Sequence, residues 1–178
     1  RSRDPEKIIN EAKTMVAQGV REVVLLGQII DRYGLDLPTG SPRLPDLLEQ
    51  LSMIPELMRI RFLTSHPNWM NDQLIDAVAQ LPKVMPHIEV PIQAGDDAVL
   101  AAMRRGYTNQ QYRELVAKLR ERIPGVSIAT DIIVGFPAES EAAFQNTYDL
   151  LADLRLDVAH LARYSPRPGT YSARYLED

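Results

Sequence analysis

The sequence predicts an α/β fold built around a parallel sheet. Short apolar runs of strand length alternate with segments in which apolar residues recur at helical spacing. This alternation favours parallel strands joined by right-handed crossovers. The clearest unit is the apolar run 132–134, which stops at Gly135 and is followed by Pro137, Glu139 and Glu141. We interpret it as a buried strand, a tight turn and a helix start opened by Pro137.

Helix positions follow from cap residues and apolar periodicity. Asp4 precedes Pro5, a favoured first helical residue, and Gly19 is a favoured residue just past a helix end. Asn71 or Asp72 is a cap candidate of the same kind, and Asp96 begins a further helix. We therefore expect helices over residues 5–18, 44–53, 72–81, 96–103, 109–123 and 140–154.

Strands are expected at the apolar runs between these helices. Each run has the length of a strand and is bounded by turn residues. We expect strands over residues 22–27, 59–63, 87–92, 126–134 and 157–163. The loop 29–45 is long for a compact domain, and long loops at strand ends often carry function; the segment 164–170 is rich in turn residues. A barrel-like sheet and an open doubly wound sheet both fit this order.

Length and composition bound the class of protein. The 178 residues are enough for one domain, which we expect to span 1–178, and 45% of them are hydrophobic. A net charge of −4 makes the chain as a whole unattractive to nucleic acid, although 20 Lys and Arg allow a local basic face. The chain has no cysteine, so it can form no disulfide and supply no thiolate to a metal or cluster.

No signature of membrane insertion or nucleotide binding stands out. No apolar stretch approaches the roughly 20 residues that span a bilayer, and there is no signal-peptide pattern, so we expect a cytoplasmic protein without membrane contact. Neither the dinucleotide-binding glycine motif nor the P-loop motif is present. Because the sequence starts at Arg1 without an initiator Met, we expect it to be part of a longer protein.

The strand ends predict a polar binding site. The carboxyl ends of parallel strands share one edge of the sheet, where ligands bind in such folds. Amides, hydroxyls, an imidazole and glycines follow the predicted strands, and two arginines lie nearby. They suit a polar organic ligand with a carboxylate or phosphate better than a divalent metal. The strand-end residues are Gly27, Gln28, Ser65, His66, Gln93, Ala94, Gly95, Gly135, Phe136, Pro137, Tyr164 and Ser165, and the nearby arginines are Arg104 and Arg105.

Each of these residues also has a structural interpretation. His66 precedes Pro67 and can cap a strand, and Gln28 and Gln93 can satisfy loop backbone. Arg104 and Arg105 end a helix, where cations complement the dipole. Asp131 falls within an apolar strand and needs a partner, which makes it either part of an ion pair or a site residue. Spacing alone therefore indicates a polar ligand edge but no reaction.

Several motifs together resemble the radical S-adenosylmethionine methylthiotransferases. The resemblance covers nearly the whole chain and is specific because the motifs occur in one order. The Ser-His-Pro and Tyr-Ser-Pro-Arg-Pro-Gly-Thr elements are closer to the tRNA-modifying branch than to the ribosomal-protein branch. The motifs occupy residues 24–28, 59–62, 64–67, 81–84, 90–95, 100–108, 130–137 and 164–170.

The resemblance implies a partial parallel (β/α) barrel of the radical SAM type, lacking its first strand. In the family that strand is followed by a Cys-x-x-x-Cys-x-x-Cys loop that holds a [4Fe–4S] cluster and would lie just before Arg1. The family also has an N-terminal domain with a second cluster and a C-terminal RNA-binding domain. The chain alone is therefore expected to be inactive. The missing strand would leave an exposed sheet edge.

The resemblance also implies an activity, cofactors and partners for the parent protein. It would insert a methylthio group into a C–H bond of N6-isopentenyladenosine in the tRNA anticodon loop, using S-adenosylmethionine and [4Fe–4S] clusters whose ligands lie outside this chain. A reductant and a sulfur donor would be further partners. No catalytic residue and no metal ligand is expected within the chain itself.

The cofactor roles implied by the resemblance are specific to position. Gly27 and Gln28 would receive the methionine end of S-adenosylmethionine, and Gln93 would face its ribose. The backbone of 132–135, with Ile133 and Gly135, would lie against adenine. Arg104 or Arg105 is a candidate for the cofactor carboxylate, a pairing that favours arginine. Ser65 and Tyr164, at two further strand ends, complete the expected cofactor-binding residues.

Three alternatives stay open. The parent could be a ribosomal-protein methylthiotransferase, or the chain could be a non-catalytic barrel module that binds RNA or protein. A phosphosugar or aldolase-like barrel enzyme would need a lysine at a strand end or a set of metal-binding side chains. Lys7, Lys13, Lys83 and Lys118 are the only lysines and none follows a predicted strand, which argues against that class.

Overall fold

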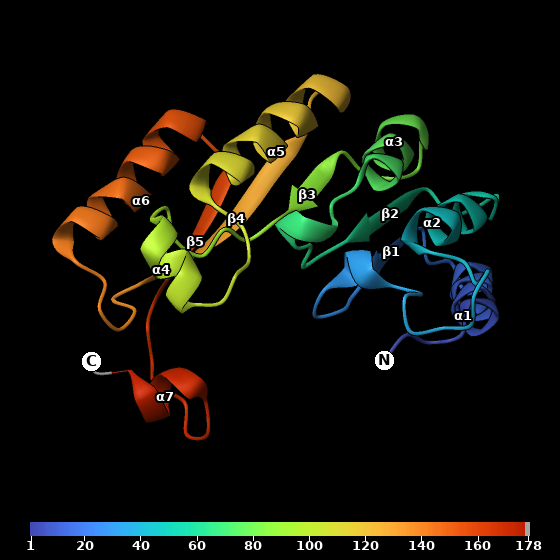
Figure 1. Cartoon of the computed structure of the whole chain (residues 1–178). Helices are drawn as coiled ribbons and strands as arrows, with labels where there is room; N and C mark the ends of the chain where they lie inside the picture. Colours follow the sequence, from blue (N-terminus) through green and yellow to red (C-terminus); the bar gives the residue numbers. More distant parts are fainter. Residues whose placement is uncertain (177–178) are drawn as a thin grey trace. The chain divides into compact units, whose positions relative to one another are not determined.

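Two pairs of parallel strands organise the chain in the computed structural model, which describes residues 1–176 (Figure 1). The chain divides into two compact units. Unit 1 comprises Arg1–Glu89 and Lys118–Ser127, and unit 2 comprises Val90–Ala117 and the residues from Ile128 onward. The parallel pairing confirms the predicted sheet type.

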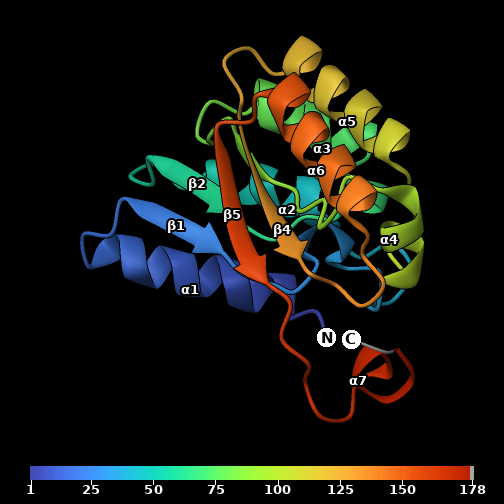
Figure 2. The ribbon, with the colours of Figure 1, turned by 90° about the vertical axis from the view of Figure 1, so that its left-hand side faces the viewer.

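Unit 1 is built on strands β1 (Glu22–Leu25) and β2 (Arg59–Phe62), which pair in parallel from Glu22 opposite Arg59 to Leu25 opposite Phe62. The helices α1 (Pro5–Ala17), α2 (Leu44–Ser52) and α3 (Asp72–Gln80) lie together on one side of this pair (Figures 1 and 2). The unit also holds strand β3 (His87–Glu89) and two 3-10 helices, η1 (Ile30–Arg32) and η2 (Pro67–Trp69).

The helix ends of unit 1 follow the cap chemistry in the sequence. The Asp4 carboxylate accepts a hydrogen bond from the Lys7 N–H, and the Asn71 side chain accepts one from the Leu74 N–H, which satisfies amide groups that the first turn leaves unpaired. Amphipathic periodicity turns the leucines of α2 inward. The core of the unit consists of side chains at most 1% exposed, among them Leu48, Leu51, Leu57, Ile60, Leu74 and Ile75.

Unit 2 is built on β4 (Ser127–Val134) and β5 (Val158–Arg163), parallel from Ala129 opposite Val158 to Val134 opposite Arg163. Helices α5 (Asn109–Arg122, whose first part belongs to this unit) and α6 (Glu141–Leu154) lie side by side in both views (Figures 1 and 2). The ion pair between Arg113 and Asp153 joins them. Two short helices, α4 (Asp97–Ala102) and α7 (Tyr171–Tyr175), complete the unit.

A close approach of backbone to helix fixes the loop before α4. Gly95 is buried, and its N–H donates to the Thr147 hydroxyl of α6 at 2.8 Å. A Cβ at this position would lie 2.5 Å from the Thr147 Cα, so only glycine fits without a shift. The segment 93–95 is thereby pinned against α6.

The structure differs from the predicted elements at four places. The predicted strand 87–92 ends at Glu89, because the Ile92 N–H bonds to the Thr130 side chain and Pro91 has no N–H to pair. Pro137 does not open the helix: residues 136–139 form a turn, and α6 starts at Glu141 after the Ser140 cap. The loop 29–45 contains η1, and α7 follows the turn-rich segment without having been predicted.

Candidate functional site

The carboxyl ends of the strands carry the candidate site, and each unit presents its own part. In unit 1 the relevant segments are 26–33, after β1, and 63–69, after β2. In unit 2 they are the segment 93–95, the turn after β4 and the residue after β5. The two parts are described separately.

Five of the predicted cofactor-binding residues of unit 2 line one cavity of about 260 Å³: Gln93, Arg104, Arg105, Ile133 and Tyr164. They come from the segment after β3, the end of α4, and the ends of β4 and β5. The cavity is also lined by Phe136, a predicted strand-end residue without a predicted cofactor role, and by Ala102, Met103, Tyr171 and Ser172, which the sequence did not indicate. Gly135 is exposed and is not among the lining residues, although its neighbour Phe136 is.

The backbone of Gln93 is held in an unusual conformation. Its φ of 79° lies in the left-handed region, which non-glycine residues rarely adopt. Two hydrogen bonds to β4 maintain this conformation: the Gln93 N–H donates to the Asp131 carbonyl, and the Ile133 N–H donates to the Gln93 carbonyl, both at 2.9 Å. Such strain is often kept at functional sites. Thr64, at the end of β2 in unit 1, shows the same feature with a φ of 67°.

Tyr164 brings an unsatisfied polar atom to the cavity. Its hydroxyl is buried and has no hydrogen-bond partner within residues 1–176. Its ring meets Phe136 edge-on, with centroids 5.2 Å apart and an angle of 74° between the planes. Because a buried polar group without a partner is costly, this hydroxyl is available to bond a ligand.

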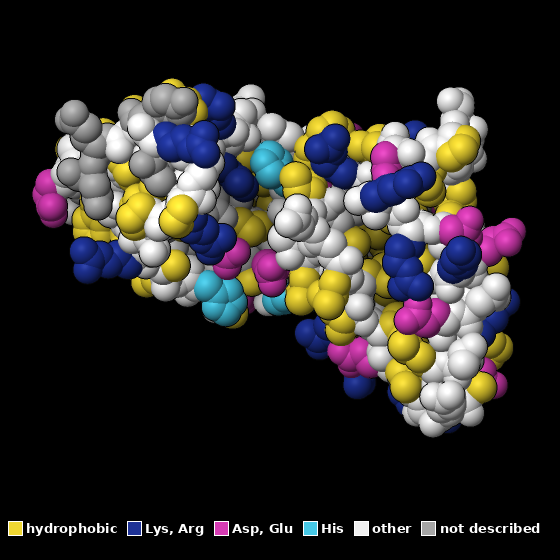
Figure 3. Space-filling model, turned by 90° about the horizontal axis from the view of Figure 1, so that it is seen from below, with side chains coloured by type: hydrophobic (Ala, Val, Ile, Leu, Met, Phe, Trp, Pro, Cys, Tyr) yellow, Lys and Arg dark blue, Asp and Glu magenta, His cyan; other side chains and the backbone are white. Residues whose placement is uncertain are grey.

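The two arginines of the cavity are held by aromatic rings. The Arg104 guanidinium lies over the Tyr171 ring, 3.8 Å from its centroid. The Arg105 Nε donates to the Tyr107 hydroxyl at 3.0 Å, and that hydroxyl donates to the Ile92 carbonyl at 2.8 Å. Burial raises the pKa of Tyr107, with Arg105 acting in the opposite direction. Figure 3 shows Lys and Arg side chains spread over one face of the molecule among hydrophobic ones. A carboxylate would be favoured beside the two arginines of the cavity.

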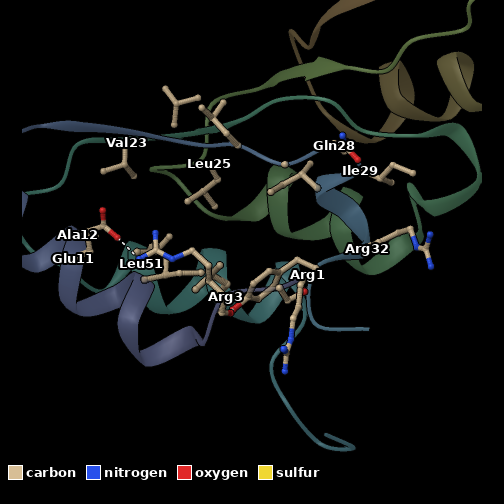
Figure 4. Close-up of a pocket in the computed structure, with 18 of the residues that line it drawn as sticks. Arg1, Arg3, Glu11, Ala12, Val23, Leu25, Gln28, Ile29, Arg32 and Leu51 are labelled. Carbon is tan, nitrogen blue, oxygen red and sulfur yellow. Dashed lines mark hydrogen bonds and ion pairs between the residues drawn. The ribbon is translucent and has the colours of Figure 1, made fainter. Parts of the chain in front are cut away.

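In unit 1 the predicted residues Gly27 and Gln28 line a larger cavity of about 780 Å³ between α1, β1 and η1. Figure 4 shows Gln28 and Ile29 at one end of it and the ion pair of Arg3 with Glu11 at another. Much of its wall is apolar, including Val23 and Leu25. Gly27 and Gln28, which the strand-end rule indicated, therefore both line a cavity.

Ser65 lies apart from that cavity. Its side chain is 3% exposed, and its hydroxyl has no hydrogen-bond partner within the described chain. The adjacent His66 caps the 3-10 helix η2 and not a strand as its structural interpretation predicted, because its Nδ1 accepts a hydrogen bond from the Asn68 N–H. Asp131 is half-buried on β4, opposite His160 of β5 in the strand register.

The residues of the candidate site fit S-adenosylmethionine but not an iron–sulfur cluster. In unit 2, the unpartnered Tyr164 hydroxyl, the strained Gln93 and the two arginines match a ligand with ribose hydroxyls and a carboxylate. A cluster finds no match in this chain, because it has no cysteine. The residues described also hold no group of three or more His, Asp or Glu placed to bind a metal. No helix among them is long and apolar enough to cross a bilayer.

The family comparison covers most of the chain. Residues 1–151 match the model described as the Radical SAM superfamily. Curated relatives share high identity with nearly the whole chain and are named tRNA-2-methylthio-N(6)-dimethylallyladenosine synthase. The Roseiflexus sp. (strain RS-1) protein is 56% identical over 97% of this chain and 36% of its own length. The Chloroflexus aurantiacus protein is 51% identical over 100% of this chain and 38% of its own length. A Dehalococcoides mccartyi protein is 53% identical over 100% of this chain and 42% of its own length.

Solved structures share the fold at low identity. The radical S-adenosylmethionine methyltransferase TsrM from Kitasatospora setae, solved with cobalamin and a [4Fe-4S] cluster, has a TM-score of 0.69. It is 17% identical and aligns with 90% of this chain and 31% of its own. Elp3 from Methanocaldococcus infernus has a TM-score of 0.61 at 12% identity over 95% of this chain and 46% of its own. The predicted fold, a partial barrel of the radical SAM type, is confirmed.

Proposed function

Because the chain belongs to the radical SAM superfamily, we propose that its parent protein is a methylthiotransferase acting on N6-dimethylallyladenosine in tRNA. The identity of 51–56% to relatives of that name, sustained over at least 97% of the chain, carries this proposal. The chain spans only 36–42% of the length of those relatives. The activity is therefore proposed for the whole protein, with this chain as its radical SAM core domain.

S-adenosylmethionine is the cofactor that the cavity of unit 2 supports. Its volume of about 260 Å³ is below the roughly 300–1,000 Å³ of pockets that enclose a whole ligand, so the cofactor would be enclosed only in part and would extend beyond the cavity. Gln93 would bond the ribose, the apolar backbone near Ile133 and Gly135 would lie along adenine, and Tyr164 would bond a polar edge. Arg104 or Arg105 would pair with the carboxylate. When bound, S-adenosylmethionine supplies the product's methyl group and a reactive carbon at its C5′ position.

The residues of this chain act by orienting the cofactor and excluding water. The two hydrogen bonds to β4 fix Gln93, and the close approach of Gly95 to α6 prevents the segment 93–95 from moving outward. Phe136 and Ile133 supply dry walls on either side of the polar groups. Since small displacements of reacting atoms are costly, this rigidity is the chain's contribution to rate. Gly27, Gln28 and Ser65 belong to unit 1, and their roles toward the cofactor stay predictions.

The remaining partners belong to the parent protein. A [4Fe–4S] cluster would be ligated by residues outside this chain, and a reductant and a sulfur donor would be required. A tRNA-modifying enzyme of this kind would work in the cytoplasm. These proposals follow from the names of the relatives and the family match.

The test uses the full-length protein, reconstituted anaerobically with iron and sulfide. Reduced protein should cleave S-adenosylmethionine and convert N6-dimethylallyladenosine in tRNA to its 2-methylthio form, detected by mass spectrometry of the nucleosides. Gln93→Ala should weaken cofactor affinity, whereas Gln110→Ala, an exposed residue on α5, should not. Cleavage without a modified nucleoside, with the methylthio group found on a ribosomal protein instead, would move the protein to the other branch.

A further inference from the structure

An arginine and a tryptophan from two different loops of unit 1 stack on each other. The Arg32 guanidinium lies over the Trp69 ring, 4.8 Å from its centroid. Arg32 ends η1, in the loop after β1, and Trp69 ends η2, in the loop after β2. The pair therefore lies at the carboxyl edge of the β1–β2 pair, where ligands bind in parallel α/β folds.

Hydrogen bonds between the two loops hold the pair in place. The Ile30 N–H donates to the Thr64 carbonyl at 3.2 Å, and the Asp31 carboxylate accepts the His66 N–H at 2.8 Å. The Trp69 N–H donates to the His66 carbonyl at 2.9 Å. Because these bonds already order both loops, a ligand that bound there would lose little free energy in ordering them.

Both side chains remain accessible. Trp69 is 37% exposed and is the single tryptophan of the sequence. Arg32 is exposed, and none of the ion pairs found within residues 1–176 includes it. Figure 4 shows its side chain leaving η1 at the edge of the cavity and pointing away from Ala12 and Leu51.

We propose that Arg32 and Trp69 form a stacking site for one unpaired nucleotide of the RNA substrate. The base stacks on the exposed part of the indole, and the guanidinium, already held against the ring, binds the adjoining phosphate. Proteins that recognise single-stranded RNA combine aromatic platforms with arginine in this way. The inference rests on the proposed function, because it takes tRNA as the substrate.

The experiment measures binding of the full-length protein to an RNA stem-loop with the sequence of the anticodon arm, over a series of salt concentrations. Trp69→Ala should weaken binding by about 5- to 100-fold, the range seen when a base loses an aromatic partner. Trp69→Phe, which keeps a ring, should stay within about threefold of the unmodified protein. Arg32→Met should lower the slope of log K against log salt by about 0.7–0.9, the loss of one phosphate contact.

The matched control is Arg21→Met. Arg21 is an exposed arginine of the same unit that precedes β1 instead of following it, so its substitution should leave affinity and salt slope unchanged. Tryptophan emission gives a second readout. The emission of Trp69 itself is the difference between the emission of the protein without substitutions and that of Trp69→Phe. RNA should quench this difference, because stacking brings a base against the indole.

Each outcome decides the matter. Binding by Trp69→Ala within twofold of the unmodified protein, or quenching that is the same in Trp69→Phe, overturns the stacking site. Strong loss of affinity in Trp69→Phe at an unchanged melting temperature also overturns it, since phenylalanine can stack. If the protein without substitutions modifies tRNA and Trp69→Ala keeps its affinity for RNA, the stacking site is wrong but the proposed function stands. If the unmodified protein binds no RNA arm at any salt concentration, the proposed function fails with it.

Discussion

Replacing Gly95 with alanine tests the packing that positions Gln93. A Cβ at residue 95 would lie 2.5 Å from the Thr147 Cα, 2.7 Å from the Asn146 carbonyl oxygen and 2.9 Å from the Thr147 nitrogen. All three atoms belong to the backbone of α6, so no side-chain rotation can relieve the contact. Either the segment 93–95 or the helix must move.

The cost follows from three contributions. Overpacking of a tight contact costs about 1–3 kcal/mol. A shift that breaks the buried hydrogen bond from the Gly95 N–H to the Thr147 hydroxyl, 2.8 Å long, adds about 1–3 kcal/mol. Alanine also lowers the conformational entropy of the unfolded chain, which stabilises the folded state by about 0.4–1 kcal/mol and offsets part of this cost. We therefore expect Gly95→Ala to destabilise this region by about 2–4 kcal/mol.

Hydrogen exchange on the full-length protein measures this locally. A loss of 2 kcal/mol corresponds to roughly 30-fold faster exchange in peptides covering 93–99 and 143–150. Gly27→Ala is the matched control and should change exchange little. Its Cβ would come closest to the flexible end of Ile30, at 3.3 Å from Cδ1, and the nearest backbone atom, the Ile30 Cα, would lie at an ordinary contact distance of 3.5 Å. Unchanged protection in Gly95→Ala would refute the claim that this contact pins the segment.

Three further substitutions test separate parts of the account. Tyr164→Phe should weaken S-adenosylmethionine binding about tenfold with little change in melting temperature, while Tyr148→Phe on the exposed face of α6 should change neither; calorimetric titration measures both. Burial raises the pKa of Asp31 to about 6 from 3.8, so the folded state holds this proton more tightly. The free energy of unfolding should therefore fall by up to about 3 kcal/mol as the pH rises from below 3.8 to above about 6. In Asp31→Asn the melting temperature should depend less on pH over this range. Thr130→Val should cost about 1–3 kcal/mol because it leaves the buried Ile92 N–H unpaired, whereas Thr130→Ser should cost less, as denaturant midpoints would show.

Elements with strong local signals could be predicted from the sequence. The long apolar run 126–134 became β4 (Ser127–Val134), and Asn71 and Asp96, which the sequence indicated, cap helices in the structure. The strand predicted over 87–92 was too long, because apolar periodicity cannot reveal that the Ile92 N–H bonds to the side chain of Thr130 on β4 instead of to a backbone carbonyl. The turn at 136–139 displaced the helix start from Pro137 for a similar reason: the Glu139 N–H closes back on the Phe136 carbonyl.

The strand-end rule located much of the candidate site but not its walls. It indicated Gln93 and Tyr164, and the structure places both at one cavity. Phe136 stood among the predicted strand-end residues but had no predicted cofactor role. Tyr171 was missed, since an exposed aromatic residue in a short helix carries no distinctive spacing. Gly135 was indicated but does not line the cavity. The roles of these residues toward a cofactor stay predictions.

The most direct test of the central claim follows the methyl group. The full-length protein, reduced and anaerobic, would be given S-adenosylmethionine labelled in its methyl carbon, tRNA containing N6-dimethylallyladenosine, and ribosomal protein in equal amount. The account predicts the label in a 2-methylthio nucleoside of the tRNA. Label found on the ribosomal protein would contradict the account. Cleavage of the cofactor with label on neither acceptor would also contradict it.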